Sequence, residues 1–236
     1  MAPPNITRWV GIGLLGLPLY GALTFWSSLE GQPDPSTQLE AWSRFVTTNH
    51  YVLGHVLGSI LGLIFLIFGV FALGVYLATS RAGRMGLVAM VITVLGSALF
   101  LPLQGVTTFS APEEGQAVLA GIEEFESLPD IFANTVFGLT GLVVILLGFV
   151  GHILVGVAVW RSGTLPRWAG ALWAGANVLM YFSLVYGQIG PASTPFTVPL
   201  GAVMLVISGA WMVWSALSRP SAAQPVGASA PQPRVR

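Results

Sequence analysis

An uncharged stretch from residue 51 to residue 80 constrains this chain more than any other feature. It follows Asn49 and His50 and contains no aspartate, glutamate, lysine or arginine. A helix needs only about 20 consecutive apolar residues to cross the hydrocarbon core of a bilayer. The stretch therefore predicts a membrane-spanning helix, and it indicates that the whole chain is an integral membrane protein.

The composition supports this class and predicts further spans. Hydrophobic residues make up 54% of the 236 residues and charged residues 8%, whereas a soluble domain has about 25% charged residues. We expect an all-α fold, a polytopic bundle of six transmembrane helices with two short external interfacial helices. The predicted spans cover residues 9–26, 49–80, 85–108, 131–160, 168–188 and 197–217. Residues 218–236 are rich in proline, alanine and serine and are predicted to form a disordered cytoplasmic tail.

Two capping-box patterns predict the external helices. The first pattern runs from Thr37 to Glu40 and opens a helix that has Leu39, Trp42 and Val46 on one face. The second runs from Ser110 to Glu113 and precedes an apolar face of Val118, Ile122 and Phe125. Both helices are expected to be short and amphipathic and to lie at the membrane interface.

The charged residues predict an orientation in the plasma membrane. With six spans, one side holds every arginine except Arg44, and the other side holds every carboxylate. The arginines of the first side are Arg8, Arg81, Arg84, Arg161, Arg167, Arg219, Arg234 and Arg236. The positive-inside rule then places both termini in the cytoplasm.

Several classes of chemistry are disfavoured by the residue types. The chain has no cysteine, which excludes disulfides and thiol chemistry, and no lysine, which excludes Schiff-base chemistry. No charged residue lies within a predicted span, and this argues against ion-coupled transport. No metal-binding, phosphate-loop or nucleic-acid pattern appears, so no catalytic or metal residue is assigned and a non-enzymatic role is favoured.

Polar residues of several helices fall at a similar depth near the external ends of their spans. If they face inward, they form an outward-facing vestibule that binds a ligand; the alternative is that they mark the membrane–water interface. The candidate ligand-binding residues are His50, His55, Gln104, Asn134, Tyr186 and Gln188.

A glycine stripe accompanies His55. Gly54, Gly58 and Gly62 are spaced four residues apart and lie along one face of an α-helix, where another helix can approach closely. The helix that approaches the stripe belongs to the same bundle, to a second copy in a homo-oligomer or to a partner membrane subunit. The sequence does not distinguish among these three.

The histidines raise the question whether the chain could ligate a haem iron. His55 and His152 are expected to lie roughly 20 Å apart along the membrane normal, at about 1.5 Å per residue, and so cannot ligate one iron. A His55–Met204 pair matches in depth, but methionine in a span usually serves packing. No cofactor is predicted, and haem stays as an alternative. His152 is interpreted as a structural residue paired with a backbone carbonyl or with Asn177.

The segment from Arg161 to Gly170, RSGTLPRWAG, forms a tight loop that opens a glycine- and alanine-rich span. It resembles a loop of small, uncharacterised multi-span bacterial membrane proteins. The resemblance covers one loop and one helix, and it implies no activity and no functional residue.

Three functions are compatible with these features. The leading hypothesis is a non-enzymatic membrane protein that binds a partner subunit or a lipid-like, small hydrophobic ligand at the outward-facing vestibule, with membrane lipids around it. The second is a small transporter or channel for a neutral solute. The third is a haem-binding redox protein.

Overall fold

The computed structural model describes residues 6–29, 31–122, 135–189 and 196–218, and these residues contain helices but no strand. The helices are α1 (Ile6–Gly13), α2 (Gly16–Ser27), α3 (Leu39–Val46), α4 (Asn49–Leu53), η1 (Gly54–Leu61), α5 (Gly62–Ala78), α6 (Gly83–Leu119), α7 (Thr135–Ser162), α8 (Arg167–Ile189) and α9 (Thr197–Leu217). The predicted all-α class is therefore confirmed, whereas the predicted tail lies outside the described residues except for Ser218.

Five helical segments are long and apolar enough to cross a membrane. They are Trp9–Ser27, Asn49–Ala78, Gly83–Leu119, Thr135–Ser162 and Thr197–Leu217. Their apolar side chains on the outside of the bundle are typical of surfaces that face lipid. A multi-pass membrane protein is thus supported, with α8 not among these five segments.

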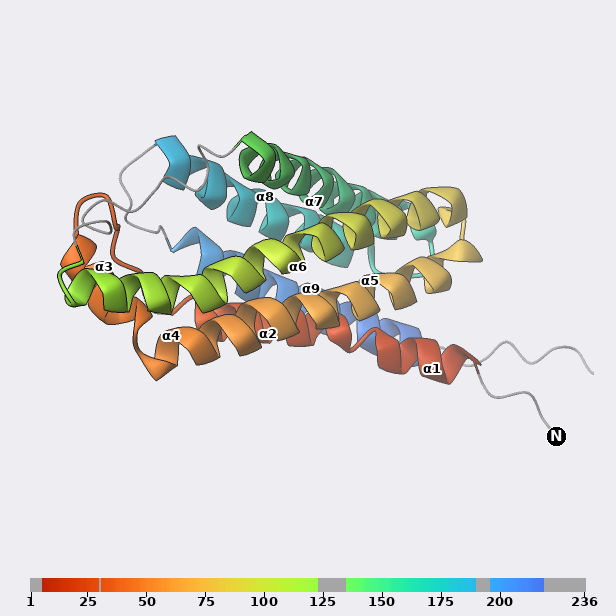
Figure 1. Ribbon diagram of the computed structural model, residues 1–236. Helices are drawn as coiled ribbons and strands as arrows, with labels where there is room; N and C mark the ends of the chain where they lie inside the picture. The colour runs from red at the N-terminus through yellow and green to blue at the C-terminus, as the bar shows by residue number, and fades with distance from the viewer. Residues whose placement is uncertain (1–5, 30, 123–134, 190–195, 219–236) are drawn as a thin grey trace, which may run out of the picture.

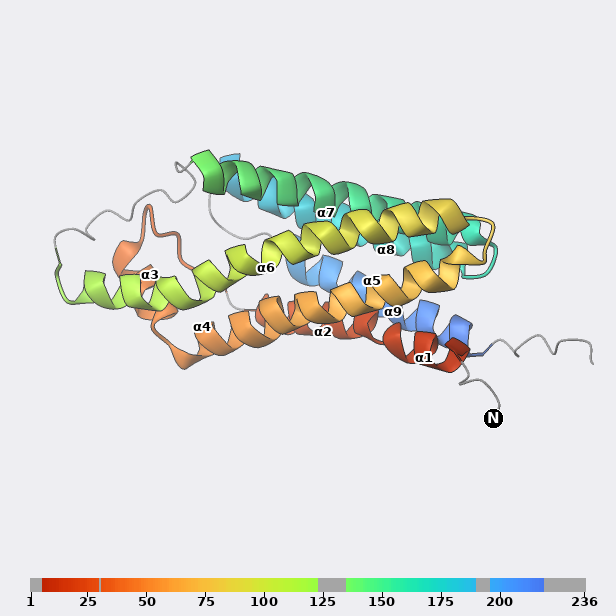
Figure 2. The same cartoon turned by 45° about the vertical axis from the view of Figure 1, so that its right-hand side comes forward.

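The long helices form a closed ring. Helix α2 packs against α5, α5 against α6, α6 against α7, α7 against α8, α8 against α9, and α9 returns to α2. Figures 1 and 2 show the resulting elongated bundle, in which the turn between α5 and α6 lies at the end opposite to α3. The centre is filled with fully buried side chains, among them Leu66, Leu73, Trp173, Leu205 and Met212.

Pro18 interrupts the first predicted span, as its lack of a backbone N–H predicts. Helix α1 ends at Gly13 and α2 begins at Gly16, so the break lies about one turn before the proline. Gly209 of α9 faces this kink, and a Cβ atom at Gly209 would lie 2.7 Å from the Pro18 nitrogen. The kink therefore also shapes the contact between α2 and α9.

Helix α6 corrects the prediction of a third span that ends near residue 108 and a separate helix that begins at Ser110. The helix runs without a break over 37 residues, through both Pro102 and Pro112. The hydroxyl groups of Thr107 and Thr108 donate to the Gln104 carbonyl, and the hydroxyl of Ser110 donates to the Val106 carbonyl. The Ser110–Glu113 pattern is thus interior to a helix and caps nothing.

Packing against α3 explains why the helix continues. Ala111 of α6 lies in a small apolar cluster with Trp42, Val46 and Tyr51. Gly115 allows α3 to approach closely, since a Cβ atom there would lie 3.0 Å from the Ser43 carbonyl oxygen. Tertiary packing therefore outweighs the local stop signals of the sequence.

Helix α3 forms where the first capping box predicts a helix, but it differs in its cap and its surroundings. Its N-cap residue is Gln38, and no side chain caps the helix. Trp42 is only 4% exposed because it packs within the protein. Trp42 is therefore part of a protein core and not an anchor that extends into lipid.

Close backbone contacts between glycines join the neighbouring helices. Gly16 of α2 and Gly69 of α5 face each other, and a Cβ atom at Gly69 would lie 2.8 Å from the Leu17 backbone nitrogen. Gly156 of α7 and Gly170 of α8 are paired in the same way. Small residues at helix crossings are the usual basis of helix association in a membrane.

We expect Gly69→Ala to destabilise the protein by about 1–3 kcal/mol, because the added methyl group meets backbone atoms that cannot move aside. The measurement is the thermal unfolding midpoint in mild detergent. Gly141→Ala is the matched control, since no described heavy atom lies within 4 Å of a Cβ at Gly141. Equal midpoints for the two variants would contradict the packing of α2 against α5.

Candidate functional site

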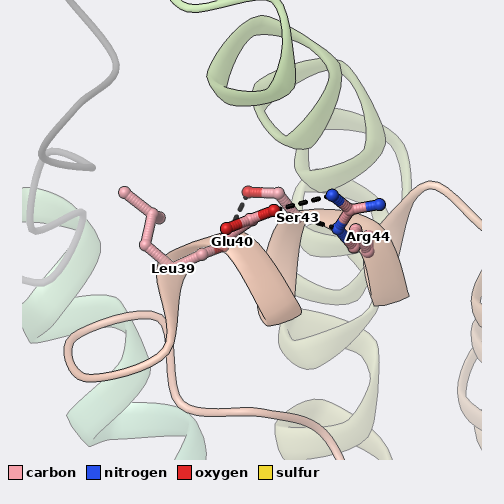
Figure 3. Close-up of polar contacts among 4 residues, drawn as sticks. All are labelled: Leu39, Glu40, Ser43 and Arg44. Atoms are coloured by element: carbon pink, nitrogen blue, oxygen red, sulfur yellow. Dashed lines mark hydrogen bonds and ion pairs between the residues drawn. The ribbon is translucent and has the colours of Figure 1, made fainter.

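The candidate site lies at the end of the bundle formed by α3, α4, the first turns of η1 and the last turns of α6, which we call the acidic end. The described carboxylates of the chain, Asp34, Glu40, Glu113 and Glu114, belong to this end. Arg44 pairs with Glu40 within α3, and the Ser43 hydroxyl donates to the Leu39 carbonyl (Figure 3). The ion pair is exposed on both sides, so it contributes little to stability.

Tyr51 connects the helices of the acidic end. Its hydroxyl group donates to the Thr107 carbonyl of α6 at 3.0 Å, and its ring is 3% exposed. The Thr48 hydroxyl caps α4 by accepting from the Tyr51 backbone N–H. Phe45 of α3 packs edge-to-face on the Tyr51 ring with the centroids 5.7 Å apart. Tyr51 therefore holds α3, α4 and α6 together.

His55 lies one turn further along the chain and is half-buried. Its ring lies against the Tyr51 ring with the centroids 4.0 Å apart, and its Nδ1 lies 3.0 Å from the Tyr51 carbonyl oxygen. A carbonyl accepts hydrogen bonds, so Nδ1 carries the hydrogen in the neutral ring and Nε2 becomes the acceptor. The His55 side chain is thus held in one orientation with an acceptor nitrogen to offer.

Gln104 lies on α6 at the same depth as His55. The hydrogen bond between Tyr51 and Thr107 places these two residues side by side. His55 follows Tyr51 by about one turn, and Gln104 precedes Thr107 by about one turn. Because the two helical segments run in opposite directions, both steps lead the same way along the bundle. Gln104 is half-buried. The structure therefore brings two of the predicted site residues to one level of neighbouring helices.

Of the other predicted site residues, the structure describes the side chain of His50 alone. His50 is exposed and packs edge-to-face on Trp26 of α2, with the centroids 6.0 Å apart. Asn134 lies outside the described residues. Tyr186 and Gln188 belong to the last turns of α8, and their side chains are not described. The vestibule formed by four helices thus stays a prediction. The structure describes the parts of it that belong to α4–η1 and α6.

The segment that carries His55 is a π-helix, which the sequence analysis missed. Over the 8 residues Gly54–Leu61 the hydrogen bonds are of the i→i+5 type, and α-helix resumes at Gly62. Glycines four residues apart read as an α-helical stripe, so no signal in the sequence distinguishes the two helix types here. π-Helical turns are rare and frequently occur at functional sites.

The glycines of the predicted stripe have different surroundings in the π-helix. Gly58 contacts α2, where a Cβ atom would clash with Ser27 and lie 3.2 Å from the Leu23 carbonyl oxygen. Gly62 has ordinary contacts, the nearest being the Tyr20 ring at 3.6 Å. Gly54 is buried, yet apart from its chain neighbours and the backbone of its own helix no described heavy atom lies within 4 Å of a Cβ position there.

A glycine without close neighbours from other helices stands next to each polar residue of the site in the chain. Gly54 precedes His55, and Gly105 follows Gln104. At Gly105, as at Gly54, no described heavy atom lies within 4 Å of a Cβ position. The apolar side chains of Leu53, Leu57 and Val106 around this level are exposed. The arrangement offers a hydrogen-bond acceptor, an amide and room for apolar atoms.

A second polar cluster lies in the core between α7 and α8. His152 is 3% exposed and lies against Trp173 and Tyr181, with centroids 5.7 and 6.3 Å away. Neither His152 Nδ1 nor Trp173 Nε1 has a hydrogen-bond partner among the described residues. The predicted pairing of His152 with Asn177 is not observed, because the Asn177 amide donates to the Trp173 carbonyl instead.

The haem alternative gains no support from these positions. Met204 packs against α8, with its Cε 3.4 Å from the Cβ position of Gly175. His55 contacts Tyr51 at the acidic end, whereas His152 contacts aromatic rings in the core. Among the described residues, no group of three or more histidine, aspartate or glutamate side chains is arranged to hold a metal ion.

Comparisons with protein-family models, with curated proteins and with solved structures found no match for this chain.

Tyr51→Phe should loosen the acidic end while leaving the ring of long helices intact. The variant loses the hydrogen bond to the Thr107 carbonyl, worth about 0.5–1.5 kcal/mol, and keeps the aromatic packing. Hydrogen exchange of the backbone amides in residues 105–119 should become faster than in the wild type. Tyr76→Phe on α5 is the control, and equal protection in both variants would show that the Tyr51 hydroxyl does not hold α6.

His152→Phe should preserve stability to within about 1 kcal/mol or increase it. The substitution keeps an aromatic ring between Trp173 and Tyr181 and removes a buried nitrogen that has no described partner, which costs about 1–3 kcal/mol. Chemical or thermal unfolding in detergent provides the measurement. A loss of more than about 3 kcal/mol would show that His152 makes a polar contact essential to the fold.

Proposed function

We propose that this chain is a non-enzymatic integral membrane protein that binds a lipid-like or small hydrophobic ligand at the acidic end, between η1 and α6. The observation that carries the proposal is that two uncrowded glycines, Gly54 and Gly105, stand next to two half-buried polar residues, His55 and Gln104, on neighbouring helical segments. Ligand sites are typically apolar and concave, with a few polar groups that orient the ligand. The His55 acceptor nitrogen and the Gln104 amide would supply those groups.

The rest of the bundle supports binding rather than passage of a solute. Fully buried apolar side chains such as Leu66, Leu205 and Met212 fill the centre of the helix ring. A route for a polar solute would need to displace them. Polar groups and uncrowded glycines at one end of the bundle, next to a packed core, are the arrangement expected of a binding site rather than of a channel.

The proposal includes a topology in the plasma membrane. We place α8 in the membrane as the sixth span, because it packs between α7 and α9 within the ring. Helix α6 has 37 residues and is about 55 Å long, whereas the hydrocarbon core is about 30 Å thick. Its last turns and α3 then project on the external side, and both termini lie in the cytoplasm by the positive-inside rule.

Gly54→Leu is the test of the proposed site. The leucine side chain would occupy the space beside Gly54, so the fraction of protein that carries a bound ligand should fall at least about tenfold. The measurement is native mass spectrometry of the protein released from its own membrane in mild detergent. Gly141→Leu on α7 adds the same side chain at another open glycine and should leave the extra mass unchanged.

The identity of the extra mass separates the alternatives. A lipid or small apolar molecule lost only in Gly54→Leu supports the proposal. An extra mass that corresponds to haem would favour the redox alternative instead of the proposal. An extra mass that corresponds to a second protein chain would favour the partner-subunit alternative. A bare wild-type chain would contradict ligand binding, and solute flux in liposomes with His55→Ala as the comparison would then test the transporter alternative.

A further inference from the structure

A pocket lies at the end of the bundle opposite to the acidic end. It has a volume of about 540 Å³ and is formed where α5 turns into α6 and α7 ends. Two arginines from the α5–α6 junction and one from the end of α7 line it together with small and apolar residues. The lining residues are Ala78, Ser80, Arg81, Ala82, Gly83, Arg84, Met85 and Arg161.

The local structure around Arg81 joins two turns of the chain. The Ser80 hydroxyl accepts from the Ala82 backbone N–H and shapes the turn that carries Arg81. Gly163, in the left-handed conformation with φ of 67°, lies in the turn after α7, where its Cβ position is 3.8 Å from Arg81 Cδ. The turn after α5 and the turn after α7 therefore meet at the pocket.

The positive charge of the pocket is not balanced by nearby carboxylates. The sequence contains no aspartate or glutamate from residue 41 to residue 112, nor after residue 130. The ion pair found among the described residues joins Glu40 and Arg44 at the acidic end. Arg81, Arg84 and Arg161 are each exposed, so their guanidinium groups are available to an anion from outside.

The start of α6 adds hydrogen-bond donors to the same pocket. No side chain caps this helix, and its first turn contains Arg84 and Met85, which line the pocket. The first backbone N–H groups of a helix lack carbonyl partners within the helix and carry partial positive charge. At α6 the Gly83 N–H donates to the Ser80 carbonyl, so the groups offered to a ligand are those of Arg84 and Met85. Together with guanidinium groups, which bind phosphate oxygens in pairs, they suit a phosphate group.

The surroundings of the pocket mark the level of lipid headgroups. Trp160 and Trp168 pack edge-to-face with centroids 5.2 Å apart, and the Arg167 guanidinium lies 5.7 and 5.6 Å from their rings. Both tryptophans are exposed, as in the aromatic belts at membrane interfaces. The pocket, through Arg161, adjoins this belt.

An apolar surface leads away from the pocket along α6. Val88, Val91 and Leu95 follow Arg84 at helical spacings of three and four residues, so they share its face of the helix. All three are exposed, by 52%, 57% and 49%. A ligand with a phosphate group in the pocket and acyl chains beside it would cover this face.

We propose that the pocket of Arg81, Arg84 and Arg161 binds the phosphodiester headgroup of an anionic phospholipid, with its acyl chains along Val88, Val91 and Leu95. This site is separate from the ligand site at the acidic end. Binding at this site places the phosphate group of the lipid in the arginine pocket and its apolar chains on α6. Basic pockets between helices at a membrane surface are known to bind such headgroups.

Lipid titration of the full chain tests this site. Delipidated protein in a neutral detergent is titrated with phosphatidylglycerol, with phosphatidylcholine as the zwitterionic comparison, and bound lipid is counted by native mass spectrometry. R81Q/R161Q should weaken phosphatidylglycerol binding at least about tenfold. R44Q/R167Q removes the same charge from arginines outside the pocket and should weaken binding less than about twofold.

Each other outcome contradicts a stated part of the proposal. If both double variants lost the same amount of phosphatidylglycerol binding, the binding would be explained by general charge attraction and not by the pocket. Equal binding of phosphatidylcholine would remove the role of the anionic headgroup. Competition by millimolar inorganic phosphate as effective as that of the lipid would assign the pocket to a free anion. If R81Q/R161Q does not fold, R81K/R161K keeps the charges, and its binding should still fall about threefold because lysine cannot bind phosphate bidentately.

Discussion

Close backbone contact between helices is the condition on which this structure depends. Lipid chains are as apolar as the side chains of the bundle, so burial of apolar surface does not by itself drive helices together in a membrane. Glycines supply the association instead: Gly16 meets Gly69, and Gly156 meets Gly170. These contacts let six long helices close into a ring whose centre is packed with large apolar side chains. A packed centre leaves the two ends of the bundle as the places where function can reside.

The two ends differ in charge and in construction. At the acidic end, Tyr51 ties α4 to the last turns of α6, and the π-helix η1 carries His55 next to the uncrowded Gly54. At the opposite end, short turns bring three arginines around a pocket at the start of α6. The first arrangement suits a largely apolar ligand with one or two hydrogen-bonding groups, and the second suits a phosphate. Both proposals make the protein a membrane component that recognises lipid-like molecules.

Hydropathy and helix signals predict much of the fold, whereas the details of the site depend on tertiary packing. The last predicted span, residues 197–217, coincides with α9, and Pro18 breaks the first span as expected. The stop signals at Ser110 and Pro112 fail because Ala111 and Gly115 pack against α3, which a local pattern cannot reveal. The π-helix is equally hidden, since glycines at intervals of four fit either helix type. The same limit applies to Gln104, whose depth relative to His55 becomes clear only through the Tyr51–Thr107 hydrogen bond.

The most direct test of ligand binding at the acidic end is an experimental density map of the protein extracted from its own membrane without delipidation. The binding proposal predicts non-protein density beside Gly54 and Gly105, within hydrogen-bonding distance of His55 Nε2, and a π-helix over Gly54–Leu61. A map in which side chains close this space, or in which the segment is a regular α-helix with no density beside it, would contradict the proposed site.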